Sequence, residues 1–373
     1  MGIYDRHLRV KHVYSYSPLW SLGGPFALSL AGLVAIISPN LVAAADAPNQ
    51  KAPLVLKEQG SFYVGGRIVT SAAISGAGTT PVPGDISVDH IYVQYQVPQA
   101  QKYRYPIIMV HGGGHTGKTY ETTPDGREGW YTSFTRRGFS PFVIDDPNRG
   151  RACCEPTRIH LVRLGIQPFN TLPSTDIYSK QRAWTTFRFG PAYPDVYPNS
   201  RFPFSAIDQY APQWVFTYRD AVELDKIANG IVAILEHVGP AILVTHSQSG
   251  PQGLRAALRR PDLVKGYISI EPAGFDIPAG SSPQTLKDVP ILTVFGDNVQ
   301  LSAQSTGWLN SARNTAALVN QAGGNATVTP LPELGIIGNT HMMMMDNNNE
   351  QIANIMENWI QNNVTGAKGQ YKP

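Results

Sequence analysis

The chain is poor in cysteine, with two among 373 residues, Cys153 and Cys154, and these are adjacent. An adjacent pair excludes a framework of disulfides across the fold and leaves a vicinal disulfide or two semi-buried thiols as alternatives. An excess of one charge is also missing, because 30 basic and 27 acidic residues leave a net charge of +3. This balance argues against nucleic acid or an anionic membrane surface as a partner.

A long uninterrupted apolar run is absent as well. The apolar stretch of residues 26–37 stops before Pro39 and falls short of the ~20 residues that a membrane-spanning helix needs. Because basic residues precede this stretch and an alanine run follows it, residues 1–45 are predicted to be a signal peptide or an N-terminal anchor. We therefore expect a secreted or periplasmic protein without a stable membrane span, in which the polar residues 46–59 form a linker.

The chain does contain a regular alternation of strand-like and helix-like segments, and its hydrophobic content of 42% is enough for one large core. Two alternating segments, residues 62–70 and 91–97, predict antiparallel strands. Short apolar runs typical of buried parallel strands occupy residues 107–110, 142–144, 241–244, 267–270 and 291–295. Helical spacing of apolar residues covers residues 221–237, 254–260, 306–320 and 351–362. This order predicts an α/β fold, with a mostly parallel sheet covered by helices on both faces.

Residues 154–218 interrupt the alternation and are rich in proline and aromatic residues, including Trp184 and Phe204. We interpret this segment as a cap insertion over the carboxyl edge of the sheet, where its aromatic side chains line an apolar pocket. The core domain then comprises residues 60–153 and 219–366. The alternative is an excursion without a functional role, whose aromatic side chains pack on the body of the protein.

The first candidate for chemistry is Ser247, at the end of the apolar run 241–244 and just before a helical segment. A strand, a tight turn and a helix in this order form a nucleophile elbow, which exposes a serine hydroxyl above the sheet. The usual elbow has glycine two residues before and after the serine, whereas this chain has Thr245 and Ser249. The start of the following helix predicts the backbone N–H of Gln248 as an oxyanion donor. A simple helix cap is the alternative role for such a serine.

A second oxyanion donor is predicted in the sequence His-Gly-Gly-Gly at residues 111–114, which follows a buried strand. In hydrolases with a nucleophile elbow this loop approaches the substrate through its glycines, and we assign the donor to the backbone N–H of Gly113. His111 is predicted to have a structural role.

The same stretch matches the phosphate-binding pattern G-x-x-x-x-G-K-[ST] at residues 112–119. That motif requires the loop to continue into a helix, and Pro124 ends any helix here within about two turns. Asp145 and Asp146 are formal candidates for a magnesium ligand, but their surroundings are not those of a nucleotide site. We therefore disfavour nucleotide binding.

A catalytic base and acid should follow the serine in the order acid, then histidine. His341 is the one histidine after Ser247, and it lies in a loop before the last predicted helix. Two residues qualify as the acid, Glu271 after the strand at 267–270 and Asp297 after the strand at 291–295. We interpret the run of methionines between His341 and Asp346 as packing residues rather than as part of a metal site.

Four segments of the chain resemble a small group of bacterial α/β-hydrolase esterases. They are ETTPDGREGW at residues 121–130, THSQSG at 245–250, SIEP at 269–272 and GNTH at 338–341. The resemblance extends from about Gly60 to Trp359. It implies an α/β-hydrolase fold, carboxylic ester substrates and no cofactor, and it favours Glu271 over Asp297 as the acid. Some members carry adjacent cysteines directly after the His-Gly of the oxyanion loop, where this chain has Gly113, so the role of those cysteines is not transferred.

These observations predict a serine hydrolase that cleaves small-molecule carboxylic esters through an acyl-enzyme on Ser247, assisted by His341 and Glu271. Because the mechanism requires a neutral histidine, activity should rise from acid toward neutral pH. The alternatives are hydrolysis of a lactone, thioester or amide by the same triad, or a non-catalytic binding protein on a hydrolase scaffold. The sequence does not indicate an oligomeric state, and it predicts no metal.

Overall fold

The computed structural model describes residues 51–71, 82–152, 154–219 and 221–372. From Pro53 onward the chain forms one compact unit. The predicted targeting segment, residues 1–45, lies outside the described residues. No helix within the described ranges is long and apolar enough to cross a membrane. Cys154 is disulfide-bonded, so it is not one of two semi-buried thiols, and Cys153 lies outside the described residues.

An eight-stranded sheet forms the centre of the compact unit. In spatial order it consists of β1 (Leu56–Ser71), β2 (Gly84–Pro98), β4 (Pro141–Asp145), β3 (Ile107–Val110), β7 (Ala241–His246), β8 (Val264–Ile270), β9 (Ile291–Phe295) and β10 (Ala326–Pro330). The hairpin of β1 and β2 is antiparallel, β2 runs antiparallel to β4, and all remaining neighbours are parallel. This confirms the predicted mostly parallel sheet.

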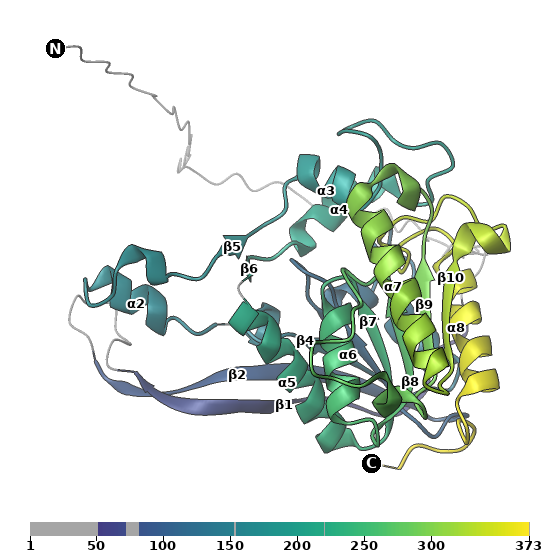
Figure 1. The fold of residues 1–373 in the computed structure, drawn as a ribbon, viewed down its shortest axis with the longest axis horizontal. Helices are drawn as coiled ribbons and strands as arrows, with labels where there is room; N and C mark the ends of the chain where they lie inside the picture. The colour runs from purple at the N-terminus through teal and green to yellow at the C-terminus, as the bar shows by residue number, and fades with distance from the viewer. Residues whose placement is uncertain (1–50, 72–81, 153, 220, 373) are drawn as a thin grey trace, which may run out of the picture. The chain divides into compact units, whose positions relative to one another are not determined.

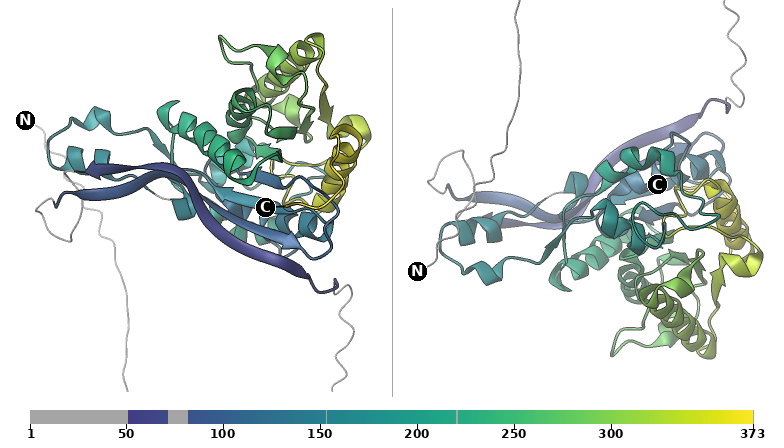
Figure 2. Two further views of the ribbon diagram at one scale, coloured as in Figure 1. Left: turned by 90° about the horizontal axis from the view of Figure 1, so that it is seen from below. Right: turned by 90° about the horizontal axis from the view of Figure 1, so that it is seen from above.

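Two details of the sheet differ from the sequence prediction. β1 begins at Leu56, inside the predicted linker, because its backbone continues to pair with β2 as far as Pro98. β10 was not predicted because it is a half-exposed edge strand, Ala326–Pro330, with few apolar residues to mark it. Figures 1 and 2 show the β1–β2 hairpin extending from the sheet beside the segment around α2, where Thr157 Oγ1 lies 3.4 Å from Ser71 Oγ.

Five main helices cover the two faces of the sheet. They are α1 (Trp130–Arg136), α5 (Ala221–Val238), α6 (Ser249–Arg259), α7 (Ala303–Gln321) and α8 (Asn349–Asn363). Alternate residues of β3 point to opposite faces, so that Ile107 joins the apolar core beneath α1 and α8, while Ile108 joins the core beneath α5, α6 and α7. Helices on both faces are therefore confirmed.

The segment between β4 and α5 contains short elements. These are α2 (Thr157–Arg163), β5 (Thr175–Asp176), α3 (Lys180–Thr186), α4 (Ile207–Tyr210) and β6 (Thr217–Tyr218). Single turns of 3-10 helix occur along the chain at η1 (Gly117–Tyr120), η2 (Gly150–Ala152), η3 (Phe169–Thr171), η4 (Phe204–Ala206), η5 (Ala211–Gln213), η6 (Pro283–Leu286), η7 (Val299–Leu301) and η8 (Leu331–Leu334).

Most aromatic residues named in this insertion pack into the core instead of lining a pocket, which corrects our expectation, although Tyr178 does line the cavity beside Ser247. Trp184, Phe189, Phe202 and Tyr210 are almost fully buried and belong to the same core as α1 and α8. Packing against that core removes their large apolar surfaces from water, which outweighs any preference for an open cleft. The segment matches the alternative interpretation in this respect, because these four aromatic side chains pack on the body of the protein.

Candidate active site

Ser247 occupies the tight turn between β7 and α6. Its φ of 54° is in the left-handed region, which costs a non-glycine residue about 1–3 kcal/mol. Hydrogen bonds hold the turn, because the backbone N–H of Ser247 donates to the carbonyl of Ile270 at 2.9 Å and its carbonyl accepts from Gly250 at 2.9 Å. The strand and helix thus present the serine in a strained, fixed conformation at the carboxyl edge of the sheet.

The structure explains how the elbow accommodates Thr245 and Ser249 in place of glycines. Thr245 Oγ1 lies 3.0 Å from the Tyr267 hydroxyl and 3.1 Å from Ser269 Oγ, while Ser249 Oγ bonds to the carbonyl that ends β3 at 3.0 Å. Room for the threonine comes from Gly253 in α6, where an added Cβ would lie 2.6 Å from Thr245 Cγ2. The space that a glycine before the serine usually provides is therefore provided here by a glycine in α6.

Glu271 and His341 meet at the same edge of the sheet. Glu271 follows β8 with a φ of 49°, and its Oε2 lies 3.1 Å from His341 Nδ1. Its other oxygen accepts from the Gly296 backbone and from the guanidinium of Arg188. Burial raises the pKa of Glu271, but the charge of Arg188 and the hydrogen bond with His341 outweigh it and hold the pKa at about 2. Glu271 is therefore a carboxylate at neutral pH.

His341 is held on three sides. Its backbone N–H donates to the carbonyl of Phe187 at 3.0 Å, its ring stacks on the Phe187 ring, and its carbonyl accepts from His246 Nε2 at 2.9 Å. Burial lowers the pKa of His341, and the contact with Glu271 offsets part of that effect. With Nδ1 on Glu271, no hydrogen-bond partner for Nε2 occurs among the described residues. The imidazole thus has one oriented nitrogen and one that is available.

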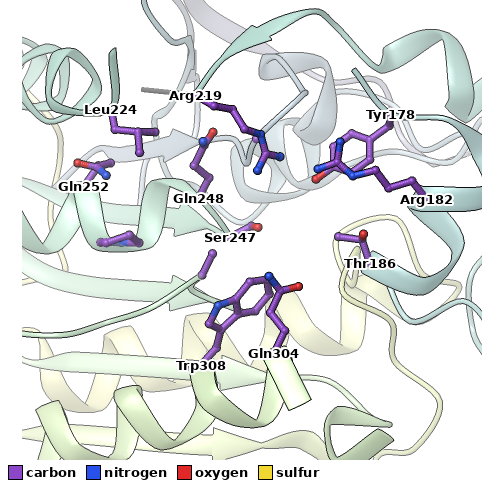
Figure 3. Close-up of a pocket in the computed structure, with 13 residues that line it drawn as sticks. Tyr178, Arg182, Thr186, Arg219, Leu224, Ser247, Gln248, Gln252, Gln304 and Trp308 are labelled. Atoms are coloured by element: carbon purple, nitrogen blue, oxygen red, sulfur yellow. The ribbon is translucent and has the colours of Figure 1, made fainter. Parts of the chain in front are cut away.

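A cavity of about 500 Å³ opens at the serine (Figure 3). Ser247, Gln248 and Gly113 all line it, so the structure brings together the serine and both predicted oxyanion donors. Trp308 lines the same cavity, and its ring centroid lies 5.8 Å from that of His341.

The oxyanion loop needs a glycine at position 112 because its backbone passes close to the nucleophile elbow. A Cβ added to Gly112 would lie 3.0 Å from Ser247 Cβ, closer than nearly all real contacts. His111 has the structural role that its position predicted, because its Nδ1 bonds to the carbonyl of Gly112 at 2.9 Å and its Nε2 accepts from the Asp146 backbone at 3.1 Å.

His115 is a site residue that sequence reasoning missed. It is buried, its Nδ1 bonds to the Gly113 carbonyl at 2.9 Å, and its Nε2 lies 2.9 Å from the Tyr210 hydroxyl in the insertion. Burial lowers the pKa of His115 to about 3, so the ring is neutral at pH 7. Because a carbonyl only accepts, Nδ1 carries the proton and Tyr210 donates to Nε2. His115 therefore connects the oxyanion loop to the insertion.

The alternative acid, Asp297, does not contact the imidazole. Its Oδ2 accepts from the Gly338 backbone at 2.8 Å and its Oδ1 accepts from the Asn298 backbone at 2.7 Å. The carboxylate of Asp297 therefore stabilises the loop that leads to His341, while Glu271 takes the hydrogen bond from the ring.

Arg188 is a second residue that sequence reasoning missed. Its side chain is 2% exposed, pairs with Glu271, and donates to the Asp297 carbonyl at 2.9 Å. A charged residue between Phe187 and Phe189 was the available signal, because a charge in an apolar surrounding is normally paired. The sequence alone did not indicate its partner, which lies 83 positions away along the chain.

The phosphate-binding alternative receives no support from the loop geometry. After β3 the chain forms only the single turn η1, and the Gly117 N–H donates to Asp145 Oδ1 at 2.7 Å instead of facing an open cradle. Asp145 itself pairs with Arg151 at 2.7 Å.

The methionine run after His341 is buried in the hydrophobic core, beginning with Met342. This burial agrees with the interpretation of the run as packing residues. The described residues contain no group of three potential metal ligands.

Comparison with known proteins decides the family. No family model matches the chain. A solved structure described as a novel bacterial esterase is 36% identical, covers 86% of this chain and 100% of its own, and superimposes with a TM-score of 0.78. The chain belongs to the α/β-hydrolase esterases. A probable secreted lipase, phiG, from Fungal sp. (strain ATCC 74256) is 29% identical over 316 residues, which are 73% of this chain and 85% of that protein.

The family assignment confirms the resemblance seen in the sequence and the α/β-hydrolase fold. This esterase is accordingly an enzyme that hydrolyses carboxylic esters. The domain boundaries of the sequence analysis and the roles of the individual site residues stay predictions.

Proposed function

We propose that this esterase cleaves its substrates through an acyl-enzyme intermediate on Ser247, with His341 as the general base and Glu271 as the acid that orients it. The observation that carries the proposal is the buried 3.1 Å contact between His341 Nδ1 and Glu271 Oε2, together with a serine at positive φ in the turn after β7. Serine hydrolases need this combination of an exposed hydroxyl, a neutral imidazole and a carboxylate that fixes its tautomer.

In the first half-reaction the Ser247 oxygen attacks the ester carbonyl while His341 Nε2 takes its proton. The tetrahedral intermediate collapses, the proton passes from His341 to the leaving alcohol, and the acyl group stays on the serine. Water then attacks the acyl-enzyme, giving its proton to the same nitrogen, and the acid is released as the proton returns to Ser247. Glu271 stays ionised throughout and stabilises the imidazolium.

We assign the stabilisation of the negative charge on each tetrahedral intermediate to hydrogen bonds from the backbone N–H groups of Gly113 and Gln248. Both residues line the cavity with Ser247, and Gln248 immediately precedes the first turn of α6. The close approach of the glycine loop to the elbow supports this assignment. One such donor contributes about 3 kcal/mol of transition-state stabilisation.

We also propose that the protein acts outside the cytoplasm. The proposal rests on the predicted signal segment, residues 1–45, and on the similarity to a protein described as a probable secreted lipase. Sequencing the N-terminus of protein recovered from the producing cells tests it, because export with cleavage predicts a start near residue 46 and retention of Met1 contradicts cleavage.

The triad is tested with 4-nitrophenyl esters of short and medium acyl chains. Ser247→Ala should abolish turnover in a folded protein, while the exposed Ser281→Ala serves as the control. Glu271→Gln should lower kcat by about 10⁴-fold, the size seen when a triad acid is neutralised, and Asp297→Asn should cost far less. Equal turnover by Ser247→Ala and wild type would refute the nucleophile. Loss of turnover in Asp297→Asn but not in Glu271→Gln would refute the acid.

A further inference from the structure

The cavity beside Ser247 is polar and carries arginines on one side. The segment between β4 and α5 supplies Arg182, Arg219 and Tyr178 to its wall. Figure 3 shows both guanidinium groups gathered with the Tyr178 ring on one side of Ser247, and Trp308 on the opposite side. The Arg182 guanidinium lies 4.8 Å from the centre of the Tyr178 ring, a cation–π contact that helps to hold it over the cavity.

One carboxylate serves both of these arginines. Asp176 pairs with Arg182, and its Oδ2 lies 2.6 Å from Arg219 Nε. Among the residues that the structure describes, two guanidinium groups and this one carboxylate leave one positive charge without compensation. None of the described residues that line the cavity is acidic. Because each guanidinium has five N–H donors and the shared carboxylate has about four acceptor sites, donors remain for a ligand.

A third arginine near the cavity is already compensated. Arg149 Nη1 lies 3.2 Å from Asp146 Oδ2, and its Nη2 donates to the side chain of Gln248 at 2.7 Å. It therefore contributes little net charge to the cavity. The uncompensated charge belongs to Arg182 and Arg219, whose side chains are 41% and 37% exposed and can be reached by a ligand.

A cavity of this kind selects among esters. A purely hydrocarbon chain placed against the guanidinium groups would remove them from water without replacing their hydrogen bonds, which is unfavourable. A carboxylate at the same place makes charge-assisted and often bidentate bonds with arginine. Trp308 and Leu224 give the cavity an apolar part that suits the short carbon skeleton joining such a carboxylate to the ester.

We propose that the preferred substrates of this esterase carry a free carboxylate in addition to the ester, and that Arg182 and Arg219 bind this carboxylate while Ser247 attacks the ester carbonyl. The inference rests on the proposed function, because it takes Ser247 as the reacting group. The carboxylate belongs either to the acyl part, as in a half-ester of a dicarboxylic acid, or to the alcohol part.

The test compares matched ester pairs that differ only in charge. For the acyl part, mono-4-nitrophenyl glutarate is compared with the corresponding glutaramate, in which a neutral amide replaces the carboxylate. For the alcohol part, 3-carboxyphenyl butyrate is compared with 3-carbamoylphenyl butyrate. We expect kcat/KM to be at least tenfold higher for the anionic member of one pair, since a hydrogen bond between charged groups contributes more than a neutral one. The pair that shows this ratio identifies the part that carries the carboxylate.

The arginines are tested through the same ratio, which cancels general damage to the enzyme. Arg219→Gln and the double variant Arg182→Gln/Arg219→Gln should reduce the ratio of anionic to neutral kcat/KM about tenfold or more. Arg313→Gln, an exposed residue that pairs with Glu333 at 3.1 Å outside the cavity lining, should leave the ratio at the wild-type value. In wild type the ratio should fall as salt is raised from 0.02 to about 0.5 M, because both arginines are exposed enough to be screened.

A second measurement does not depend on the variants. Glutarate should inhibit hydrolysis of neutral 4-nitrophenyl butyrate competitively, and glutaramide at the same concentration should inhibit at least tenfold less. Ratios near one for both ester pairs in wild type, or a ratio that survives in the double variant, would overturn the proposal. Failure of the proposed function gives a different result. If Ser247→Ala hydrolyses the esters as fast as wild type does, Ser247 is not the nucleophile, whatever the anionic-to-neutral ratios are.

Discussion

Replacing Arg188 by methionine should strongly destabilise the esterase through Glu271. The side chains of Arg188 and Glu271 are 2% and 0% exposed, so the pair is out of contact with water. Removal of one member of a buried ion pair leaves the other uncompensated and costs about 3–5 kcal/mol of unfolding free energy. Methionine has a similar length and flexibility, so the loss reports the missing charge more than a cavity.

The pKa of Glu271 gives a second value for the stability that the paired carboxylate contributes. Its lowering from 4.5 to about 2 corresponds to about 3 kcal/mol of stability at neutral pH. Because the folded-state pKa is below the unfolded one, this contribution is complete above about pH 4.5 and is lost as the pH falls toward 2. Without Arg188, burial dominates and raises the pKa of Glu271, so the difference in stability between the two proteins should shrink in acid.

Urea unfolding followed by tryptophan fluorescence at pH 7 and pH 3 measures both effects. We expect Arg188→Met to lose about 3–5 kcal/mol at pH 7 and less at pH 3. The control is Arg313→Gln, since the 50% exposed Arg313 forms a surface pair that is typically worth about 0–1 kcal/mol. A loss below about 1 kcal/mol at pH 7 would show that the pair is not the buried support we infer. A loss of the same size at both pH values would refute the electrostatic cause.

Two further predictions concern His341 and Trp184. Because burial lowers the pKa of His341 and its neutral form is the base, kcat/KM on a neutral ester should rise with pH, and the midpoint of this rise should lie below the ordinary histidine value of about 6.5. A midpoint at or above about pH 6.5 contradicts this. Trp184→Ala should lose about 3–5 kcal/mol of stability with little change in substrate preference, since Trp184 is 3% exposed in the core and does not line the cavity. Urea unfolding measures the stability, and the ester panel measures the preference. A changed preference in a protein of wild-type stability would instead support the interpretation of the insertion as a cap over the pocket.

The sequence could predict the elements whose signals are local. The apolar runs of the parallel strands identified the sheet, and the residues that follow those strands, Ser247 and Glu271, then had to meet at its carboxyl edge. His341 followed from chain order. The choice of Glu271 over Asp297 needed the family resemblance, because both follow strands and the pattern does not reveal which carboxylate turns to the ring and which to the backbone of Gly338.

The features that were missed depend on contacts between distant segments. Arg188 and Glu271 are 83 positions apart, and nothing in either neighbourhood specifies the other. The aromatic insertion was expected to line an apolar pocket because its composition suits one. Composition does not say which side of a segment faces the core, and here Trp184, Phe189 and Phe202 are buried while Arg182 reaches the cavity.

With the roles proposed above, the insertion would contribute to catalysis and to recognition at once, and this limits how it can move. Phe187 accepts the backbone hydrogen bond of His341, and Arg188 holds the charge of Glu271, within a few residues of Arg182 at the cavity wall. A lid that swung away to admit substrate would remove the counter-ion of the acid and the support of the base together. Because a buried, uncompensated carboxylate is costly, such an opening is opposed by several kcal/mol. Substrate should therefore reach Ser247 without movement of the insertion, in a cavity whose wall carries the exposed Arg182 and Arg219.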